Sequence, residues 1–479
     1  MKIGFQSLVI LIPLFFFVFQ GLGQVSETDR KTVLDLFQEK YNADDYTYIF
    51  NMFSSELQNE LTLEKTKEFL KSIKAQVGQM EKNEFLGMES NSFAAFKSFF
   101  EKGVLKMNIS IDNRNLINGF FVKPFIETSN NEEQQQLAIK LTKSCTDIPD
   151  KQIQLITEKC KNFPLNSELS IAIINNGISK FIGVKITEDT LLIYDNSHKA
   201  FEIGSITKVF TSTILASLVL DKTIKLDQPI KSVLKTRKKD IRKITFKQLS
   251  NHTSGFPRLP TNLMSSAVNV SNPYQHYNEK HLLEYLNNPI KLSNLPGEAF
   301  EYSNTGAGIL AYLLSIASSK DYHQLLDEIV FTKYNMTVST YDRNNLSAEL
   351  VDGLGALGEK VPHWDFASME GAGGIISTTK ELSKFAFAQF DTSNLDLTLT
   401  RKSTFNIDHR RSVGLGWLIM KEDTGEERFW HNGGTGGFSS SMILEVESKN
   451  AIIILSNVSP FNQHSNNIDA LCFGLIDLI

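Results

Sequence analysis

An apolar stretch that starts with a serine and a lysine is the feature that most constrains how this chain can fold. Within residues 201–212, Ser205 and Lys208 form the pattern S-x-x-K, and apolar residues follow at helical spacing through Leu218. A helix that starts here places both side chains on one face, one turn apart. A partly desolvated lysine can take the proton of a serine hydroxyl, which is otherwise a weak nucleophile. The pattern indicates a nucleophilic serine, although alone it also fits an ordinary amphipathic helix.

Length and composition describe a globular protein with two domains. The 479 residues are too many for one ordinary domain, and 41% hydrophobic with 22% charged residues is typical of globular chains. The net charge of -5 comes without a basic stripe, so we expect no nucleic-acid partner. No cysteine or histidine cluster indicates a metal, and we expect no cofactor.

Residues 1–23 have the pattern of a signal peptide. Lys2 supplies the positive start, residues 8–19 are apolar, and residues 21–23 are small or apolar ahead of a cleavage point. The apolar run is short for a membrane span. We therefore expect cleavage, a periplasmic or secreted mature protein, and no stable membrane anchor.

The chain has three cysteines, and an exported protein permits disulfides. Cys145 and Cys160 are close enough in sequence to close a small loop, which leaves Cys472 without a partner. Buried free thiols are the alternative, and the sequence does not decide between the two. It does not indicate an oligomeric state either.

Residues 24–128 are expected to form a small α+β domain, because helical periodicity gives way to strand periodicity along this stretch. Helices are predicted at 32–41, 46–51 and 63–77, and strands at 92–100, 104–111 and 116–122. The stretch resembles the DUF3887 domains that precede hydrolase domains in exported bacterial proteins, a likeness carried mostly by residues 117–124. No catalytic pattern occurs here, so we expect a structural or substrate-guiding role, with dimerisation as a weaker alternative.

Residues 129–165 are predicted to be a polar linker with one helix that runs through Cys160. Residues 166–479 are predicted to form the second domain. It opens with a hairpin, whose strands are expected at 169–174 and 178–185.

Tyr302 and Asn304 belong to a second pattern, Tyr-Ser-Asn, ahead of a helix predicted at 306–318. A tyrosine held near a lysine can act as a general base. An asparagine amide can bind a substrate carbonyl or the lysine. The alternative is a buried tyrosine ahead of a helix cap, since only the fold can bring Tyr302 to Ser205.

A glycine-rich stretch at 430–438 contains His431, Gly433 and Gly434 and leads into a strand predicted at 439–445. A strand at the edge of a site can supply backbone N–H groups to an oxyanion hole. The histidine can hydrogen-bond the substrate or the tyrosine. A glycine-rich hairpin with a surface histidine is the alternative.

In this order the three patterns resemble those of the class C β-lactamase family of serine hydrolases, which includes penicillin-binding D-Ala-D-Ala peptidases and related esterases. The likeness covers about residues 166–479, with further support from the segments 249–255, 295–297, 371–374 and 414–417. It implies an α/β (α+β) fold of the β-lactamase/transpeptidase type, which is an antiparallel sheet flanked by helices, with a mostly helical region beside it.

The resemblance also implies a role for each residue. Ser205 is the nucleophile that forms an acyl-enzyme, and Lys208 and Tyr302 are the candidates for its base, between which the sequence does not decide. Asn304 orients the substrate and the lysine. The backbone N–H groups of Ser205 and Gly434 form the oxyanion hole.

At His431 the chain departs from the family pattern, because β-lactamases of this class have Lys-Thr-Gly where this chain has His431-Asn432-Gly433. A histidine is mostly neutral at pH 7, so a fixed positive charge for a penicillin carboxylate is missing. We therefore expect a serine hydrolase that cleaves a small-molecule or peptide-like ester or amide, for which cell-wall peptides are one source. A class C β-lactamase or D-Ala-D-Ala carboxypeptidase is the first alternative, and a non-catalytic sensor with a penicillin-binding fold is the second.

Overall fold

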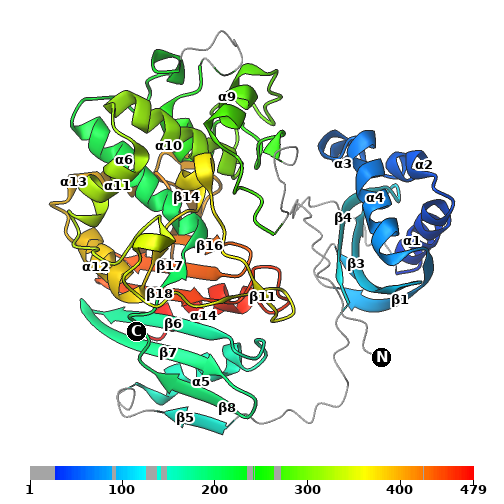
Figure 1. Cartoon of the computed structure of the whole chain (residues 1–479), viewed down its shortest axis with the longest axis horizontal. Coiled ribbons are helices and arrows are strands. Elements are labelled where there is room, and N and C mark those ends of the chain that lie inside the picture. The colour runs from blue at the N-terminus through cyan, green and yellow to red at the C-terminus, as the bar shows by residue number, and fades with distance from the viewer. Residues whose placement is uncertain are drawn as a thin grey trace. The chain divides into compact units, whose positions relative to one another are not determined.

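The structure is a computed structural model that describes residues 27–88, 93–125, 138–141, 148–234, 241, 243–263, 271–423 and 425–479. It divides the chain into two compact units, residues 1–132 and 133–479 (Figure 1). The signal peptide expected at 1–23 lies outside the described residues. Among the helices of the described ranges, none combines the length and the apolar composition needed to cross a membrane.

The first unit contains helices packed on a four-stranded antiparallel sheet, in the order β1-β2-β3-β4. Its elements are α1 (Glu27–Asn42), α2 (Tyr46–Asn51), α3 (Ser55–Glu60), α4 (Leu63–Val77), β1 (Met80–Met88), β2 (Ala94–Phe100), β3 (Gly103–Ile111) and β4 (Ile117–Pro124). Strand β1 was not predicted, because after Met80 its residues are exposed or half-buried and the first four of them are polar. One apolar core joins these helices to this sheet.

The second unit is built on a sheet that has ten strands among the described residues, in the order β13-β14-β15-β16-β17-β18-β6-β7-β8-β5. Neighbouring strands are antiparallel, except that β5 runs parallel to β8. The strands are β5 (Ala138–Leu141), β6 (Glu168–Asn175), β7 (Ile178–Ile186), β8 (Thr190–Tyr194), β13 (Phe405–Asn406), β14 (Arg411–Val413), β15 (Leu418–Lys421), β16 (Glu427–Gly434), β17 (Ser439–Glu445) and β18 (Asn450–Ser456).

Both faces of this sheet are buried, so its central strands are almost continuously apolar. In β6, Ile171 and Ile173 face one core, and Ala172 and Ile174 face the other. The first core includes α5 (Asp150–Cys160) and α14 (Asn466–Ile476), and the second includes α6 (Thr207–Leu220), α10 (Asn304–Ser318) and α12 (Thr379–Phe390) (Figure 1). The expected antiparallel sheet flanked by helices is confirmed.

Shorter elements complete the helical region and the edges of the site. They are α7 (Phe246–Ser250), α9 (Glu279–Asn287), α11 (Tyr322–Leu326), α13 (Leu395–Thr400), β9 (Phe201–Glu202), β10 (Gly353–Leu354), β11 (Lys360–Val361) and β12 (Ile376–Ser377), with short helical turns η2 (Gly204–Ile206) and η6 (Ala367–Ala372). Because β9 pairs with β12, the backbone just before Ser205 is fixed.

The segment 129–165, expected to be a linker, includes part of the second unit. Strand β5 pairs with β8, and α5 buries Ile156 and Cys160 in the core beneath the sheet. Composition was misleading here, because the exposed face of α5 is highly charged. Cys160 and Cys472 are buried free thiols, and Cys145, the expected partner of Cys160, lies outside the described residues.

Candidate active site

The S-x-x-K pattern spans the junction of η2 and α6. Ser205 lies in the η2 turn, and Lys208 lies in the first turn of α6, so Lys208 Nζ is 2.9 Å from Ser205 Oγ. Helix α6 is buried on almost every side, because it is apolar around most of its circumference. Lys208 itself is only 2% exposed.

Burial sets the protonation of Lys208. It lowers the pKa of the amine well below its usual value, and the positive charge of Arg258 lowers this pKa further. Nζ also contacts the backbone oxygen of Ala372 at 2.6 Å, within the glycine-rich stretch 371–374. An amine with a lowered pKa is more often neutral at pH 7 and can then accept a proton from Ser205.

Tyr302 lies beside this pair. Lys208 Nζ is 4.9 Å from the centre of the Tyr302 ring, and the ring centre of His431 is 6.2 Å away. Burial raises the pKa of Tyr302 to about 12, although its hydrogen bond with Ser205 and the charge of Arg258 act to lower it. The phenol therefore keeps its proton at pH 7.

The turn that carries Tyr302 is held by the segment 252–258. Ser303 caps α10, since its Oγ accepts a hydrogen bond from Gly306 N at 2.9 Å and donates one to Pro257 O at 2.8 Å. Ser303 N donates to His252 Nδ1 at 3.2 Å. The capping interpretation of the Tyr-Ser-Asn pattern is thus correct for the serine, while the tyrosine faces the site.

Asn304 is oriented by Tyr274 rather than by Lys208. Its Nδ2 donates to the Tyr274 hydroxyl at 3.4 Å, and its backbone N donates to Arg258 O at 2.9 Å. Its Oδ1 is buried, and no partner for it occurs among the described residues. An unpaired buried acceptor of this kind still has the capacity to accept a hydrogen bond from an N–H donor.

Strand β16 presents His431 and Gly433 to the site, and Asn432 points to the other face, because side chains alternate along a strand. A Cβ on Gly433 would lie 2.8 Å from Ser205 N and 2.1 Å from Ile203 O, so only glycine fits. Asn432 Nδ2 instead donates to Asp469 Oδ2 of α14 at 2.8 Å. The Asn432 side chain, which occupies the position of the threonine in Lys-Thr-Gly, therefore contacts α14.

His431 is neutral in this setting. Burial lowers its pKa to about 3, and the positive charge that Lys208 carries when it is protonated acts in the same direction, against a hydrogen bond to the backbone of Asn432 that raises it. In the neutral ring Nδ1 donates to Asn432 O at 2.6 Å, which leaves Nε2 as an acceptor. The expected absence of a fixed charge at position 431 agrees with this burial.

The backbones expected to form the oxyanion hole adjoin one another. Gly204 has φ 51°, a left-handed conformation that glycine adopts without strain. A Cβ on it would lie 2.5 Å from Gly434 N. This close approach brings the amide of Ser205, the next residue, beside the end of β16.

His252 is a site residue that sequence reasoning missed. It is buried, its ring centre is 4.5 Å from that of Tyr302, and its φ of 59° is unusual for a residue other than glycine. The stretch 249–255 had served only as evidence of family likeness. Arg258 and Tyr274 belong to no recognisable pattern, and only the fold brings them to the site.

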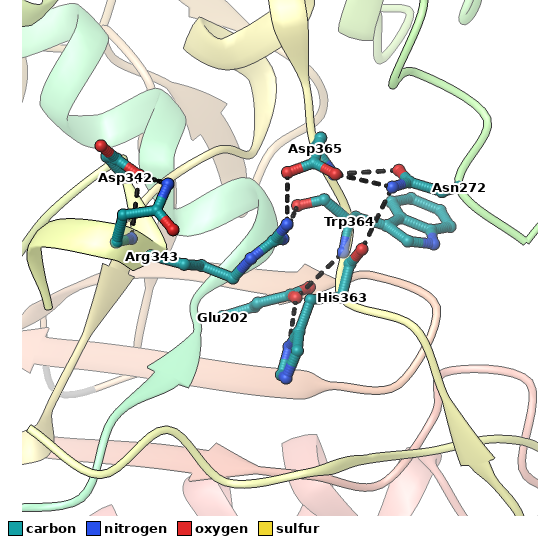
Figure 2. Close-up of polar contacts among 8 residues, drawn as sticks. Glu202, Asn272, Asp342, Arg343, His363, Trp364 and Asp365 are labelled. Carbon is teal, nitrogen blue, oxygen red and sulfur yellow. Dashed lines mark hydrogen bonds and ion pairs between the residues drawn. The ribbon is translucent and has the colours of Figure 1, made fainter.

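Glu202, three residues ahead of Ser205, anchors a network of polar contacts (Figure 2). Its Oε1 accepts hydrogen bonds from His363 Nδ1 at 2.8 Å and from Trp364 N at 3.0 Å. The next residue, Asp365, is paired with Arg343 at 2.7 Å and bonded by Asn272 Nδ2 at 2.8 Å. Residues distant in sequence are thereby fixed to the strand that precedes Ser205.

This network reaches Asn304 through aromatic packing. Tyr274 stacks on Phe366 with ring centres 5.0 Å apart and packs edge-on against Trp364 at 5.6 Å. Because Tyr274 accepts the hydrogen bond of Asn304, the network around Glu202 also positions the side-chain amide of Asn304. Among the described residues, no group of three or more His, Cys, Asp or Glu side chains is arranged to hold a metal ion.

Residues 183–471, well over half of the chain, match the family model described as beta-lactamase. The chain belongs to the beta-lactamase family. A second model, a protein of unknown function (DUF3887), matches residues 35–120. Both resemblances drawn from the sequence are confirmed, and so is the expectation of a serine hydrolase of this family.

Curated relatives of this beta-lactamase-family chain carry several activities in their names. The D-alanyl-D-alanine-carboxypeptidase/endopeptidase AmpH of Escherichia coli K12 is 26% identical over 301 residues, which span 58% of this chain and 74% of the relative. Penicillin-binding protein 4* of Bacillus subtilis is 23% identical over 54% of this chain and 61% of its own length. A beta-lactamase of Pseudomonas fluorescens is 24% identical over 52% of this chain and 68% of its own.

Solved structures share the fold of the beta-lactamase-family unit. The D-alanine carboxypeptidase AmpC of Burkholderia cenocepacia superposes with a TM-score of 0.57 at 18% identity, over 69% of this chain and 99% of that one. The octameric penicillin-binding protein homologue of Pyrococcus abyssi gives a TM-score of 0.56 at 21% identity, over 68% of this chain and 76% of that one. Both likenesses establish the fold.

Proposed function

We propose that this protein cleaves an ester or amide through an acyl-enzyme on Ser205. The observation that carries the proposal is the distance of 2.9 Å between Ser205 Oγ and Lys208 Nζ, for a lysine whose pKa is held far below its usual value. In this scheme Lys208 is the base, because the phenol of Tyr302 keeps its proton at pH 7.

The proposed proton path uses both residues. As Ser205 Oγ bonds to the substrate carbonyl carbon, its proton passes to Lys208, and Tyr302 donates a proton to the leaving nitrogen or oxygen while Lys208 returns one to Tyr302. The N–H groups of Ser205 and Gly434 stabilise the oxyanion. Water then releases the acyl group by the same steps in reverse, so no proton is gained or lost by the enzyme.

Esterase or peptidase activity ranks above β-lactamase activity in this proposal. A neutral His431 stands where a lysine would offer its charge to a penicillin carboxylate. A D-alanyl peptidase is the second candidate, since the unpaired Oδ1 of Asn304 can accept an amide N–H of a peptide and one relative is named as such a peptidase. The proposed location is the periplasm or the exterior of the cell, which rests on residues 1–23.

The test compares hydrolysis of a short-chain nitrophenyl ester with that of a chromogenic cephalosporin, with Ser205→Ala as the blank. We expect ester turnover in the wild type, little cephalosporin turnover, and none of either in Ser205→Ala, whose melting temperature should match the wild type. Full residual activity in that variant would rule out Ser205 as the nucleophile. If a fluorophosphonate probe fails to label the folded wild type, the non-catalytic sensor becomes the better hypothesis.

A further inference from the structure

The inner groups of the proposed site carry no fixed charge. His431, with a pKa lowered to about 3, is neutral at pH 7, and Tyr302, with a pKa raised to about 12, is protonated and neutral. The pKa of Lys208 is also far below its usual value because of burial. A charged substrate therefore has to be recognised by a group outside this inner set.

Arg258 is a cation at the edge of the same site. Its guanidinium carbon lies 5.0 Å from the centre of the Tyr302 ring, and the side chain is exposed. Its backbone oxygen accepts hydrogen bonds from Asn304 N at 2.9 Å and Thr305 N at 3.2 Å, which fixes the base of the side chain to the start of α10. The guanidinium is thus held on the ring of a proposed catalytic residue.

No acidic side chain neutralises Arg258 among the described residues. Other exposed or half-exposed arginines of this unit are paired, such as Arg343 with Asp365, Arg410 with Asp423 and Arg411 with Asp408. The charge of Arg258 instead acts on the site, since it helps to lower the pKa values of Lys208, His252 and Tyr302. An uncompensated guanidinium that faces a reaction site is a ready partner for an anion.

We propose that Arg258 binds a carboxylate of the substrate, so that the preferred substrates are acyl donors with a carboxylate a few bonds from the scissile ester or amide. This inference rests on the proposed function of Ser205. The planar guanidinium can form two parallel hydrogen bonds to a carboxylate, and an arginine does not lose its charge at any working pH. Arg258 would then supply, from another element, the positive charge that is missing at His431.

Two matched pairs of probes locate the carboxylate. Mono-4-nitrophenyl adipate and 4-nitrophenyl hexanoate differ by a carboxylate in the acyl part, and 3-acetoxybenzoate and 3-acetoxybenzamide differ by one in the leaving group. The measured quantity is the ratio of kcat/KM for the anionic probe to that for its neutral partner, after subtraction of the Ser205→Ala rate. We expect the wild type to prefer the anion in at least one pair.

In Arg258→Gln we expect this ratio to fall about tenfold in that pair, mainly through KM, while Arg258→Lys keeps most of it. The preference of the wild type should also weaken in high salt, as expected for an ion pair near the surface. The ratio removes any general effect of Arg258 on Lys208, which alters both probes of a pair equally. Lys225→Gln, which removes a charge from another exposed position, is the matched control and should keep the ratio.

An unchanged ratio in Arg258→Gln for both pairs would overturn the inference and make Arg258 a surface cation stacked on an aromatic ring. So would a wild type that favours the neutral probe of each pair. If the wild type turns over no probe above the Ser205→Ala rate, the proposed function fails, and this inference fails with it. If the wild type hydrolyses the esters but shows no preference for the anionic probes, the inference about Arg258 fails while the proposed function stands.

Discussion

At the scale of single residues, burial of Lys208 is the decisive property of the site. An exposed lysine is charged at pH 7 and cannot act as a base. In this protein α6 encloses the amine in apolar packing and leaves Ser205 Oγ and Ala372 O as its hydrogen-bond partners. The surrounding core compensates for the free energy of burying the amine, and this burial is what suits Lys208 to the proposed role of base beside Ser205.

Replacing Lys208 by arginine should abolish turnover, because a guanidinium keeps its proton at any working pH and cannot take that of Ser205. Lys208→Met should be equally inactive. We expect each kcat to fall by at least about a hundredfold in the ester assay. In the wild type kcat/KM should rise with pH through the lowered pKa of Lys208, since the neutral amine is the active form.

The control for this prediction is Lys225→Met, at an exposed position that lies outside the proposed site. Its rate and pH profile should match those of the wild type. Substantial activity in Lys208→Arg would exclude Lys208 as the base and leave Tyr302 in that role.

At the scale of elements, the contact between η2 and the end of β16 sets the position of Ser205. Gly204 and Gly433 both lack the Cβ that would separate the two backbones. The pairs β9–β12 and β16–β17 hold the two sides in register. Ser205 is therefore positioned by backbone packing rather than by its own side-chain contacts alone.

Gly433→Ala should damage catalysis more than Gly434→Ala does. The new Cβ at 433 would meet Ile203 O at 2.1 Å and Ser205 N at 2.8 Å, whereas at 434 the nearest atom is Pro460 Cγ at 3.1 Å, in a side chain that can shift. We expect kcat of Gly433→Ala to fall about a hundredfold, and a loss at least tenfold smaller in Gly434→Ala. Equal losses in the ester assay would contradict this account of the contact.

At the scale of the whole molecule, each unit has its own core. One apolar cluster is confined to the helices and sheet of the first unit, and two others occupy the two faces of the large sheet. All three tryptophans, Trp364, Trp417 and Trp430, belong to the second unit. Tryptophan fluorescence therefore reports the unfolding of the second unit by itself.

The second unit should lose stability in acid. The pKa of His431 is about 3 when folded against a usual 6.5, so the unfolded chain binds one more proton as the pH falls below 6.5. The stabilisation is present above pH 6.5 and is lost toward pH 3, at up to roughly 1.4 kcal/mol per pH unit. His252, whose pKa is also lowered, adds a loss of the same sign.

Urea unfolding followed by tryptophan fluorescence at pH 7, 6 and 5 checks this expectation. His431→Gln should reduce the slope of unfolding free energy against pH. The reduction corresponds to at most one proton fewer taken up on unfolding, because glutamine does not titrate. His409→Gln, at an exposed position, is the control and should keep the wild-type slope. A slope unchanged by His431→Gln would mean that this histidine binds protons equally in the folded and unfolded chains, which would contradict the lowered pKa.

The sequence by itself determined what depends on neighbours along the chain. Ser205 and Lys208 are three residues apart at a helix start, so the geometry of one turn alone brings their side chains together. The helix at 63–77 was predictable from periodicity, because its apolar residues recur at helical spacing. The strand at 439–445 was predictable from the glycine-rich stretch that precedes it.

Only the tertiary structure decided which distant residues join that pair. Tyr302 and His431 could be placed beside Ser205 through family resemblance, whereas His252, Arg258 and Glu202 could not, since their roles depend on packing between separate elements. Strand β1 was missed because Met80 alone among its residues is buried, whereas the helix through Cys160 was predicted but assigned to a linker, since the exposed residues of α5 are mostly charged. Local spacing is a property of the chain, but burial, which sets every pKa in the site, exists only after folding.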